Sequence, residues 1–299
     1  MWTKENIPDQ TGKTVIITGA NVGIGYETAL ALYEKGANVI LACRDEKKGE
    51  SAAKEISKTN HKGSIEVLKL DLSDLNSVKE AAEIFKSKYQ KLDILINNAG
   101  VMAPPASFTA QGFELQFGTN VIGHYAFTGH LFNTLKATPQ SRIITVSSLV
   151  YTLGKIDYSN LKIEKKYDPN REYAQSKLGN LLFTLELQRR IEKAGEDILS
   201  VASHPGGTQT NLSRFITQQE YNHMIEVYGE LMPTWKGALP SLFAAASPEI
   251  NGGDLVGPDQ DGGIRGYPEK AAIEPFALDL IEAQKLWKYA EEVTGIIYP

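Results

Sequence analysis

The chain has 299 residues, of which 42% are hydrophobic and 22% are charged, a composition typical of a folded globular protein rather than a disordered one. Its formal net charge is -5 at pH 7, which argues against a surface built to bind nucleic acid. Because α/β proteins of this length often share one continuous core, we expect a single domain over residues 1–299.

Cysteine content and apolar runs indicate the cellular setting. Cys43 is the single cysteine, so the chain cannot form an intramolecular disulfide, as is usual in a reducing compartment. Residues 1–10 are polar, and the chain contains no run of about 18 apolar residues, the length of a spanning helix. We therefore expect a cytoplasmic protein with no membrane span.

Six short apolar segments alternate with helical patterns between residues 13 and 206. The last three segments are almost continuously apolar, as expected for strands that are covered by helices on both faces of a sheet. The alternation favours an α/β fold with a doubly wound parallel sheet and right-handed crossovers. The predicted strands are 13–18, 38–44, 64–73, 92–100, 141–148 and 197–206.

The C-terminal region has a different pattern. Residues 224–235 carry apolar side chains at helical spacing, residues 251–268 are rich in glycine, and residues 271–292 again have the pattern of a helix. We expect a helical cap and a closing strand here. The short apolar run 242–246 is expected to be a buried helix turn, because it is far too short to span a membrane.

The first predicted strand leads into TGANVGIG, which places glycines at positions 19, 23 and 25. A glycine-rich turn before a helix lets the backbone approach a pyrophosphate, and the helix N-terminus offers free N–H groups to the anion. The spacing differs from the GxGxxG of the common dinucleotide fingerprint. A plain glycine turn is the alternative, but strand, helix and spacing together favour a dinucleotide site.

Tyr173 and Lys177 lie four residues apart at the start of a predicted helix, so both side chains project from one face. A nearby ammonium group favours the phenolate form of tyrosine and lowers its pKa from about 10. Such a pair can transfer a proton to or from a hydroxyl oxygen. The alternative is an exposed tyrosine beside a solvated lysine. It would be favoured if this pair occurred without other motifs.

Further motifs follow in a fixed order along nearly the whole chain: NNAG at 97–100, Asn120 in FGTNVIGHY, VSS at 146–148, YAQSK at 173–177 and HPGGTQT at 204–210. With TGANVGIG they resemble the short-chain dehydrogenase/reductase family. ACRDEKKGE, GTNVIGHY and GYPEKA most resemble its retinol dehydrogenase-like and protochlorophyllide reductase-like branch. The resemblance implies a Rossmann fold and an enzyme that moves a hydride between a nicotinamide cofactor and an alcohol or carbonyl carbon of a small molecule.

The resemblance also implies a role for each matching residue. Tyr173 would be the acid/base, and Lys177 would lower its pKa and hold the nicotinamide ribose. Ser148 would hold the substrate oxygen, Asn120 would support a proton relay, and Ser147 should point away because successive strand residues alternate faces. The residues expected to contact the cofactor are Gly19, Asn21, Gly23, Ile24, Gly25, Arg44, Asp71, Leu72, Asn97, Ala99, Gly100, Tyr173, Lys177, Pro205, Gly206 and Thr210.

The end of the second strand bears on the choice of cofactor. An NAD enzyme usually has an acidic residue there to bind the ribose 2′-hydroxyl, whereas Arg44 can bind a 2′-phosphate. We predict NADP(H), and NAD(H) stays open because Asp45 would repel a phosphate if it turned inward. The structural alternatives are a surface role for Arg44 and a capping role for Asp71 before the next helix.

The sequence indicates the class of substrate less specifically than the fold or the cofactor. Segments 149–172 and 211–235 are expected to cover it, and we predict a lipophilic small molecule. A non-catalytic dinucleotide-sensing or interaction protein on the same fold is the alternative, which the intact Tyr173 and Lys177 disfavour. The five histidines lack metal-like companions, so no metal is expected, and a homo-oligomer is left open. The apolar side chains that could line a pocket are Met102, Val150, Leu153, Phe215, Ile216 and Met224.

Overall fold

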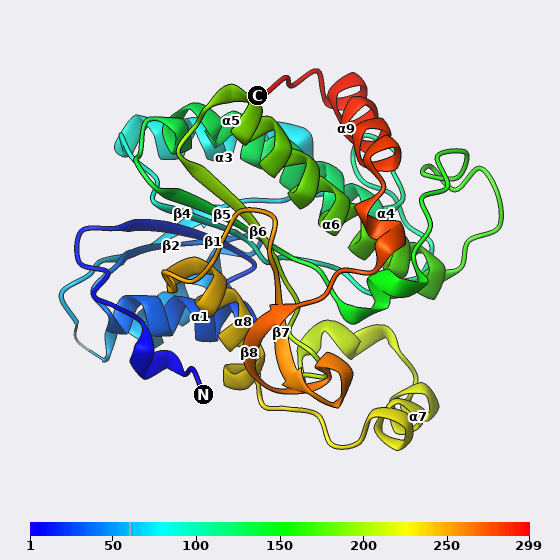
Figure 1. The fold of residues 1–299 in the computed structure, drawn as a ribbon, viewed down its shortest axis with the longest axis horizontal. Coiled ribbons are helices and arrows are strands. Elements are labelled where there is room, and N and C mark those ends of the chain that lie inside the picture. Colours follow the sequence, from blue (N-terminus) through cyan, green and yellow to red (C-terminus); the bar gives the residue numbers. More distant parts are fainter. Residues whose placement is uncertain (60) are drawn as a thin grey trace.

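A computed structural model, which describes residues 1–59 and 61–299, has one eight-stranded sheet between two layers of helices (Figure 1). The strand order is β3-β2-β1-β4-β5-β6-β7-β8. Neighbouring strands from β3 to β7 are parallel, and β8 is antiparallel to β7. The strands are β1 (Thr14–Thr18), β2 (Asn38–Cys43), β3 (Ile65–Lys69), β4 (Ile94–Asn97), β5 (Ser141–Val146), β6 (Ile198–Ser203), β7 (Leu255–Gln260) and β8 (Arg265–Ala271).

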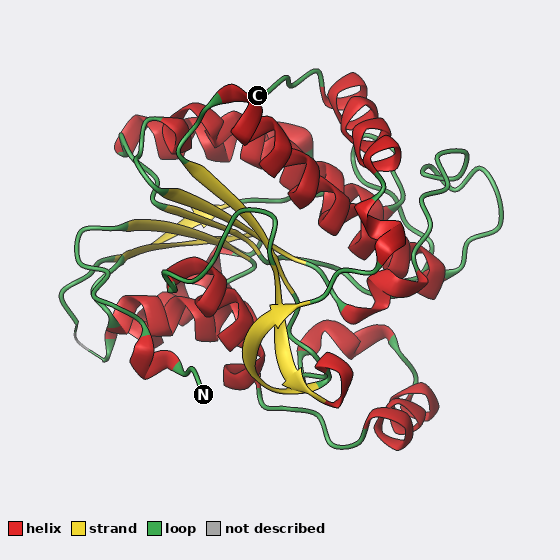
Figure 2. Cartoon of the chain, in the orientation of Figure 1, coloured by secondary structure: helices red, strands yellow, loops and turns green. Residues whose placement is uncertain are grey.

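Helices cover both faces of the sheet, as Figure 2 shows. Helices α3, α5, α6 and α9 contribute to the core on one face, and α1, α2 and α8 to the core on the other. The predicted doubly wound α/β fold is therefore confirmed. The helices are α1 (Gly23–Glu34), α2 (Glu46–Ser57), α3 (Leu75–Lys88), α4 (Leu115–Phe117), α5 (His124–Lys136), α6 (Pro169–Ala194), α7 (Gln218–Tyr228), α8 (Thr234–Ala246) and α9 (Leu280–Thr294).

Burial explains why the predicted strands are so apolar. All five residues of β1 are buried, as are all four residues of β4 beside it. Predicted strands 64–73, 92–100, 141–148 and 197–206 extend beyond the observed strands, which end at residues 69, 97, 146 and 203. The chain leaves the sheet at these points, and the loops that follow carry most of the motifs.

The C-terminal region departs from the sequence prediction in two places. The strand β8 is antiparallel, so the sheet is not wholly parallel. The helix predicted over 271–292 begins only at Leu280, because residues 265–271 pair with β7 and Pro275–Leu278 form a 3-10 turn. The indole of Trp287 then packs against the rings of Tyr125 and Phe183, which fixes α9 over α5 and α6.

The predicted helical region 224–235 is divided in the structure. Helix α7 ends before Gly229, whose φ of 74° is left-handed, and α8 begins after Pro233. The run 242–246 is a buried part of α8, as predicted. Across residues 1–59 and 61–299, no helix combines the length and apolar character needed to cross a membrane.

Candidate active site

A cavity of about 780 Å³ lies at the carboxyl ends of the parallel strands, where β1 and β4 mark the reversal of strand order. Ligands of doubly wound sheets bind at this position because the loops diverge there. The cavity brings together twelve of the predicted site residues: Gly19, Asn21, Gly23, Ile24, Gly25, Arg44, Ala99, Gly100, Tyr173, Lys177, Pro205 and Thr210.

Two glycines of the turn have no room for a side chain, because the loop after β4 packs closely against them. Gly19 has a left-handed φ of 67°, and a Cβ there would lie 2.9 Å from the Cα of Ala99. A Cβ on Gly25 would lie 2.6 Å from Nδ2 of Asn98. Val22, the residue before α1, makes no side-chain cap, so the first N–H groups of the helix have no side-chain partner there. The turn therefore fits the pyrophosphate of a dinucleotide.

Two cations, Arg44 and Lys48, lie at the end of the cavity formed after β2, beside the carboxylates of Asp45 and Glu55. The Arg44 side chain is exposed. The Asp45 carboxylate accepts the Lys48 backbone N–H at 3.1 Å and lies 3.6 Å from the Lys48 ammonium. The carboxylate of Asp45 is thus occupied as the N-cap of α2. Sequence reasoning missed Lys48, although Asp45 as a helix cap would have placed it in the first turn of α2.

The catalytic candidates lie at the other end of the cavity. Tyr173 and Lys177 project from α6, and the Lys177 ammonium lies 5.6 Å from the centre of the Tyr173 ring. Ser148, just after β5, makes a side-chain hydrogen bond with Tyr173. The Lys177 ammonium donates to the carbonyl oxygen of Val146 at 2.9 Å. Ser147 lines the cavity and Ser148 does not, but the Ser147 hydroxyl donates to the Lys177 carbonyl oxygen at 2.8 Å.

Burial controls the pKa values of this pair. Burial raises the pKa of the Tyr173 phenol above its ordinary value, and the hydrogen bond with Ser148 opposes that rise. Burial also lowers the pKa of Lys177 to about 8. Burial outweighs any lowering of the Tyr173 pKa here, and the Lys177 ammonium is directed to Val146. That Lys177 lowers the pKa of Tyr173 stays a prediction.

Asn120 is not on the cavity wall but lies directly behind it. It belongs to the π-helical segment Gly118–Gly123, which joins α4 to α5. Its Oδ1 accepts the backbone N–H of Val101 at 2.9 Å, and its Nδ2 donates to the Val101 carbonyl oxygen at 3.0 Å. The side chain therefore fixes the loop after Gly100, close to the Lys177 ammonium.

Four predicted cofactor contacts do not line the cavity. The Asn97 amide turns into the core and donates to Thr128 at 3.0 Å, and Asn98 lies on the wall instead. The Asp71 carboxylate accepts from the Ser73 backbone and hydroxyl, so it fixes a local turn rather than capping α3, for which Asp74 is the N-cap. The other two are Leu72, which is buried, and Gly206.

Further wall residues follow Thr210 in a 3-10 turn: Asn211, Leu212 and Arg214. The Thr210 hydroxyl accepts the backbone N–H of Leu212 at 3.3 Å and caps this turn. Sequence reasoning missed them because the HPGGTQT motif ends at Thr210. The apolar residues proposed for a substrate pocket, from Met102 to Met224, do not belong to the wall of this cavity.

Comparison with known proteins agrees with this geometry. The family model described as short chain dehydrogenase matches residues 13–221, which include the glycine turn, Ser148, Tyr173 and Lys177. The chain belongs to the short-chain dehydrogenase family. It is an NAD(P)-dependent oxidoreductase that acts on alcohol or carbonyl groups.

Relatives of this short-chain dehydrogenase include human retinol dehydrogenase 12, which is 47% identical over 95% of this chain and 87% of that protein. Human retinol dehydrogenase 13 is 39% identical over 99% and 88%, respectively. Human retinol dehydrogenase 11 is 49% identical, but that alignment covers 68% of this chain and 63% of the relative. A solved structure of an uncharacterised protein from Mycobacterium paratuberculosis has a TM-score of 0.83, with 38% identity, and covers 100% of this chain and 99% of its own.

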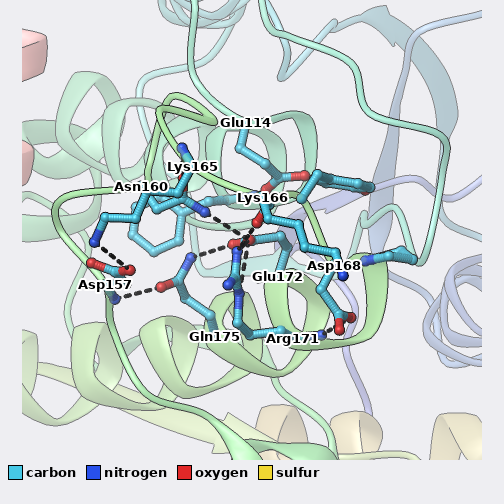
Figure 3. Close-up of polar contacts among 12 residues, drawn as sticks. Glu114, Asp157, Asn160, Lys165, Lys166, Asp168, Arg171, Glu172 and Gln175 are labelled. Carbon is cyan, nitrogen blue, oxygen red and sulfur yellow. Dashed lines mark hydrogen bonds and ion pairs between the residues drawn. The ribbon is translucent and has the colours of Figure 1, made fainter.

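A buried polar network fastens residues 157–168 of this short-chain dehydrogenase to the start of α6 (Figure 3). Its centre is the carboxylate of Glu172, the residue before Tyr173, which is 1% exposed. Asn160 donates to it at 3.2 Å and Gln175 at 2.8 Å, and the guanidinium of Arg171 forms an ion pair with it. Gln175 in turn accepts the backbone N–H of Asp157 at 2.6 Å.

Glu172→Ala is expected to lower the free energy of unfolding by about 2 kcal/mol, because three donors then lose their buried acceptor. Glu172→Gln, which keeps an acceptor oxygen, should lose less. Urea denaturation of both variants measures the difference. Glu226, an exposed residue of α7, provides the control Glu226→Ala. Equal stability of Glu172→Ala and Glu226→Ala would show that the network contributes nothing.

Proposed function

We propose that this enzyme uses NADP(H) to interconvert an alcohol and a carbonyl group of a lipophilic small molecule, in a reducing compartment such as the cytoplasm. The observation that carries the cofactor preference is the cationic end of the cavity. Arg44 and Lys48 both face a ligand there, while the Asp45 carboxylate is held in the cap of α2. Glu55, the other carboxylate that lines this end, forms an ion pair with Lys58. Arg44 and Lys48 therefore favour a 2′-phosphate over a hydroxyl.

The catalytic end of the cavity supports proton transfer to a carbonyl oxygen. When bound, the nicotinamide supplies or accepts the hydride. The buried Tyr173 phenol has a raised pKa, so it is protonated at neutral pH and can donate its proton. Ser148 is hydrogen-bonded to Tyr173, so both hydroxyls can reach one substrate oxygen. Lys177, with a pKa of about 8, adds positive charge beside them at neutral pH.

Two observations support a lipophilic substrate. Leu153, on the turn after Ser148, is 79% exposed, and Phe215, next to the wall residue Arg214, is 44% exposed. Apolar side chains left open to solvent in segments that border a site favour an apolar ligand. The curated relatives named retinol dehydrogenases 11 to 14 support the same class of substrate, a lipophilic alcohol or its carbonyl product.

Fluorescence titration with NADPH and with NADH tests the cofactor proposal. We expect the unmodified protein to bind NADPH more tightly, and Arg44→Ala to weaken NADPH binding by about 30-fold through loss of charged hydrogen bonds. NADH binding should change by less than about twofold, because its ribose hydroxyl does not need the guanidinium. Lys48→Ala should act in the same direction as Arg44→Ala.

Lys47 offers a matched control, because it is an exposed lysine beside Lys48 that does not line the cavity. Lys47→Ala should leave the affinity for both dinucleotides unchanged. Tighter binding of NADH by the unmodified protein, or an equal loss of both affinities in Arg44→Ala, would contradict the proposed preference.

A further inference from the structure

His124 lies buried where the π-helical segment meets α5, and both of its ring nitrogens have partners. Nδ1 lies 3.0 Å from the backbone carbonyl oxygen of Asn120, which can only accept a hydrogen bond. The ring hydrogen is therefore on Nδ1. Burial and the charge of Lys177 lower the pKa of His124 to about 4, so the ring is neutral and Nε2 is an acceptor.

Nε2 of His124 lies 2.9 Å from the hydroxyl of Thr18, at the end of β1. This hydroxyl accepts the backbone N–H groups of Asn98 and Ala99, each at 2.9 Å, so its own hydrogen is free to point at His124. The other acceptor within reach, the Ile96 carbonyl oxygen, is farther away at 3.4 Å. Thr18 thus joins His124 to the turn after β4, which forms one wall of the cofactor cavity.

On its other side, the hydrogen-bond chain reaches the catalytic helix through Asn120. The Asn120 side chain donates from Nδ2 to the hydroxyl of Ser176 at 2.9 Å. The Ser176 hydroxyl donates in turn to the carbonyl oxygen of Tyr173 at 2.8 Å. Asn120 and Ser176 are fully buried, so water does not compete for these bonds. Every donor along the chain faces the same way, from the cavity wall towards Tyr173.

We propose that His124 is a positioning residue that couples cofactor binding in the cavity to the alignment of the helical turn holding Tyr173. The ring spans two partners on opposite sides, Thr18 on the cofactor strand and Asn120 on the catalytic side. A phenylalanine would fill the same space and connect neither partner. The coupling rests on the family's use of NAD(P) and is independent of the preference for NADP(H).

Hydrogen–deuterium exchange with and without NADPH tests this coupling, after fluorescence has confirmed that the cofactor is bound; NADH replaces NADPH if it binds more tightly. In the unmodified protein the cofactor should slow exchange both in residues 97–101 and in residues 169–178. In His124→Phe the slowing in 97–101 should persist, while that in 169–178 should fall by about fivefold, the effect of one buried hydrogen bond.

Two further variants test the series of hydrogen bonds from Thr18 to Tyr173 without changing His124. Ser176→Ala removes the last link at a helical position that alanine suits, so it remains informative if His124→Phe does not fold. It should lose the slowing in 169–178 as His124→Phe does. Thr18→Ser keeps the hydroxyl, so the cofactor should slow exchange in both segments as it does in the unmodified protein. Full slowing in 169–178 in Ser176→Ala or His124→Phe, with cofactor bound, would overturn the proposal.

The side-chain nitrogen spectrum of ¹⁵N-histidine-labelled protein reports which ring nitrogen of His124 carries the hydrogen. A residue that only fills space would not require one particular tautomer. The His124 ring should be neutral with its hydrogen on Nδ1 at pH 7. A hydrogen on Nε2 would reverse the direction of the bond to Thr18 and would also overturn the proposal. Failure of the unmodified protein to bind either dinucleotide would instead contradict the proposed function itself.

Discussion

Tyr173→Phe is expected to lower kcat for carbonyl reduction by about a thousandfold, because the proton donor is removed while the ring that packs beside Lys177 remains. The substrate for this measurement is the member of a series of aliphatic aldehydes of increasing chain length that the unmodified protein reduces fastest with NADPH. The affinity for NADPH should change by less than about threefold, since the phenol is on α6, whereas Arg44 and Lys48 follow β2.

Tyr89 provides the control for this variant. Its hydroxyl donates to Glu66 at 2.5 Å, and it does not line the cavity. Tyr89→Phe should therefore leave kcat unchanged. Unaltered turnover in Tyr173→Phe would remove Tyr173 from the proton-transfer step, and loss of NADPH binding in that variant would show that the change disturbed the cavity instead.

Much of the fold could be predicted from local sequence, because parallel strands such as β1 and β4 are fully buried and are almost continuously apolar. For the C-terminal region the sequence predicted a closing strand, but not the bounds of β8 or its antiparallel direction. Residues 265–271 are part of a glycine-rich stretch and contain Pro268, features that argue against a strand. They form one because β8 is at the edge of the sheet and pairs only with β7.

In the site, the motif order predicted which segments meet at the cavity, but not which side chain of a motif faces it. The motif NNAG places Asn97 and Asn98 side by side at the end of β4. The strand continues through Asn97, so its amide is buried among Thr128 and Thr145, and only Asn98 turns towards the cavity. A shift of one residue at a strand end exchanges an inward side chain for an outward one.

The sequence also could not predict how deeply Tyr173 and Lys177 are buried. The spacing of Tyr173 and Lys177 predicts that they act together, and the helix α6 does bring them to one cavity. Spacing says nothing about desolvation, which raises the pKa of Tyr173 and lowers that of Lys177 to about 8. The two groups therefore begin the reaction as a neutral phenol and an ammonium that can lose its proton near physiological pH.

The rate of carbonyl reduction is expected to stay constant below about pH 7 and to fall as the pH rises through about 8, the pKa of Lys177. The sign follows from the charged form: the ammonium exists below this pKa and stabilises negative charge developing on the substrate oxygen. Lys177→Met should lower kcat by about a hundredfold and abolish this dependence, because methionine fills similar space without charge. Steady-state kinetics from pH 6 to 10 with saturating NADPH measure both effects.

The titration of Glu114 must be distinguished from that of Lys177 in this experiment, because burial raises the pKa of the Glu114 carboxyl to about 7. This carboxylate accepts the backbone N–H groups of Gln116 and Phe117 and lies outside the cavity. Glu114→Gln should therefore keep the fall in rate near pH 8. If the fall disappears in Glu114→Gln and persists in Lys177→Met, the pH dependence belongs to the Glu114 carboxyl, and the proton transfer by Tyr173 does not depend on the lysine charge.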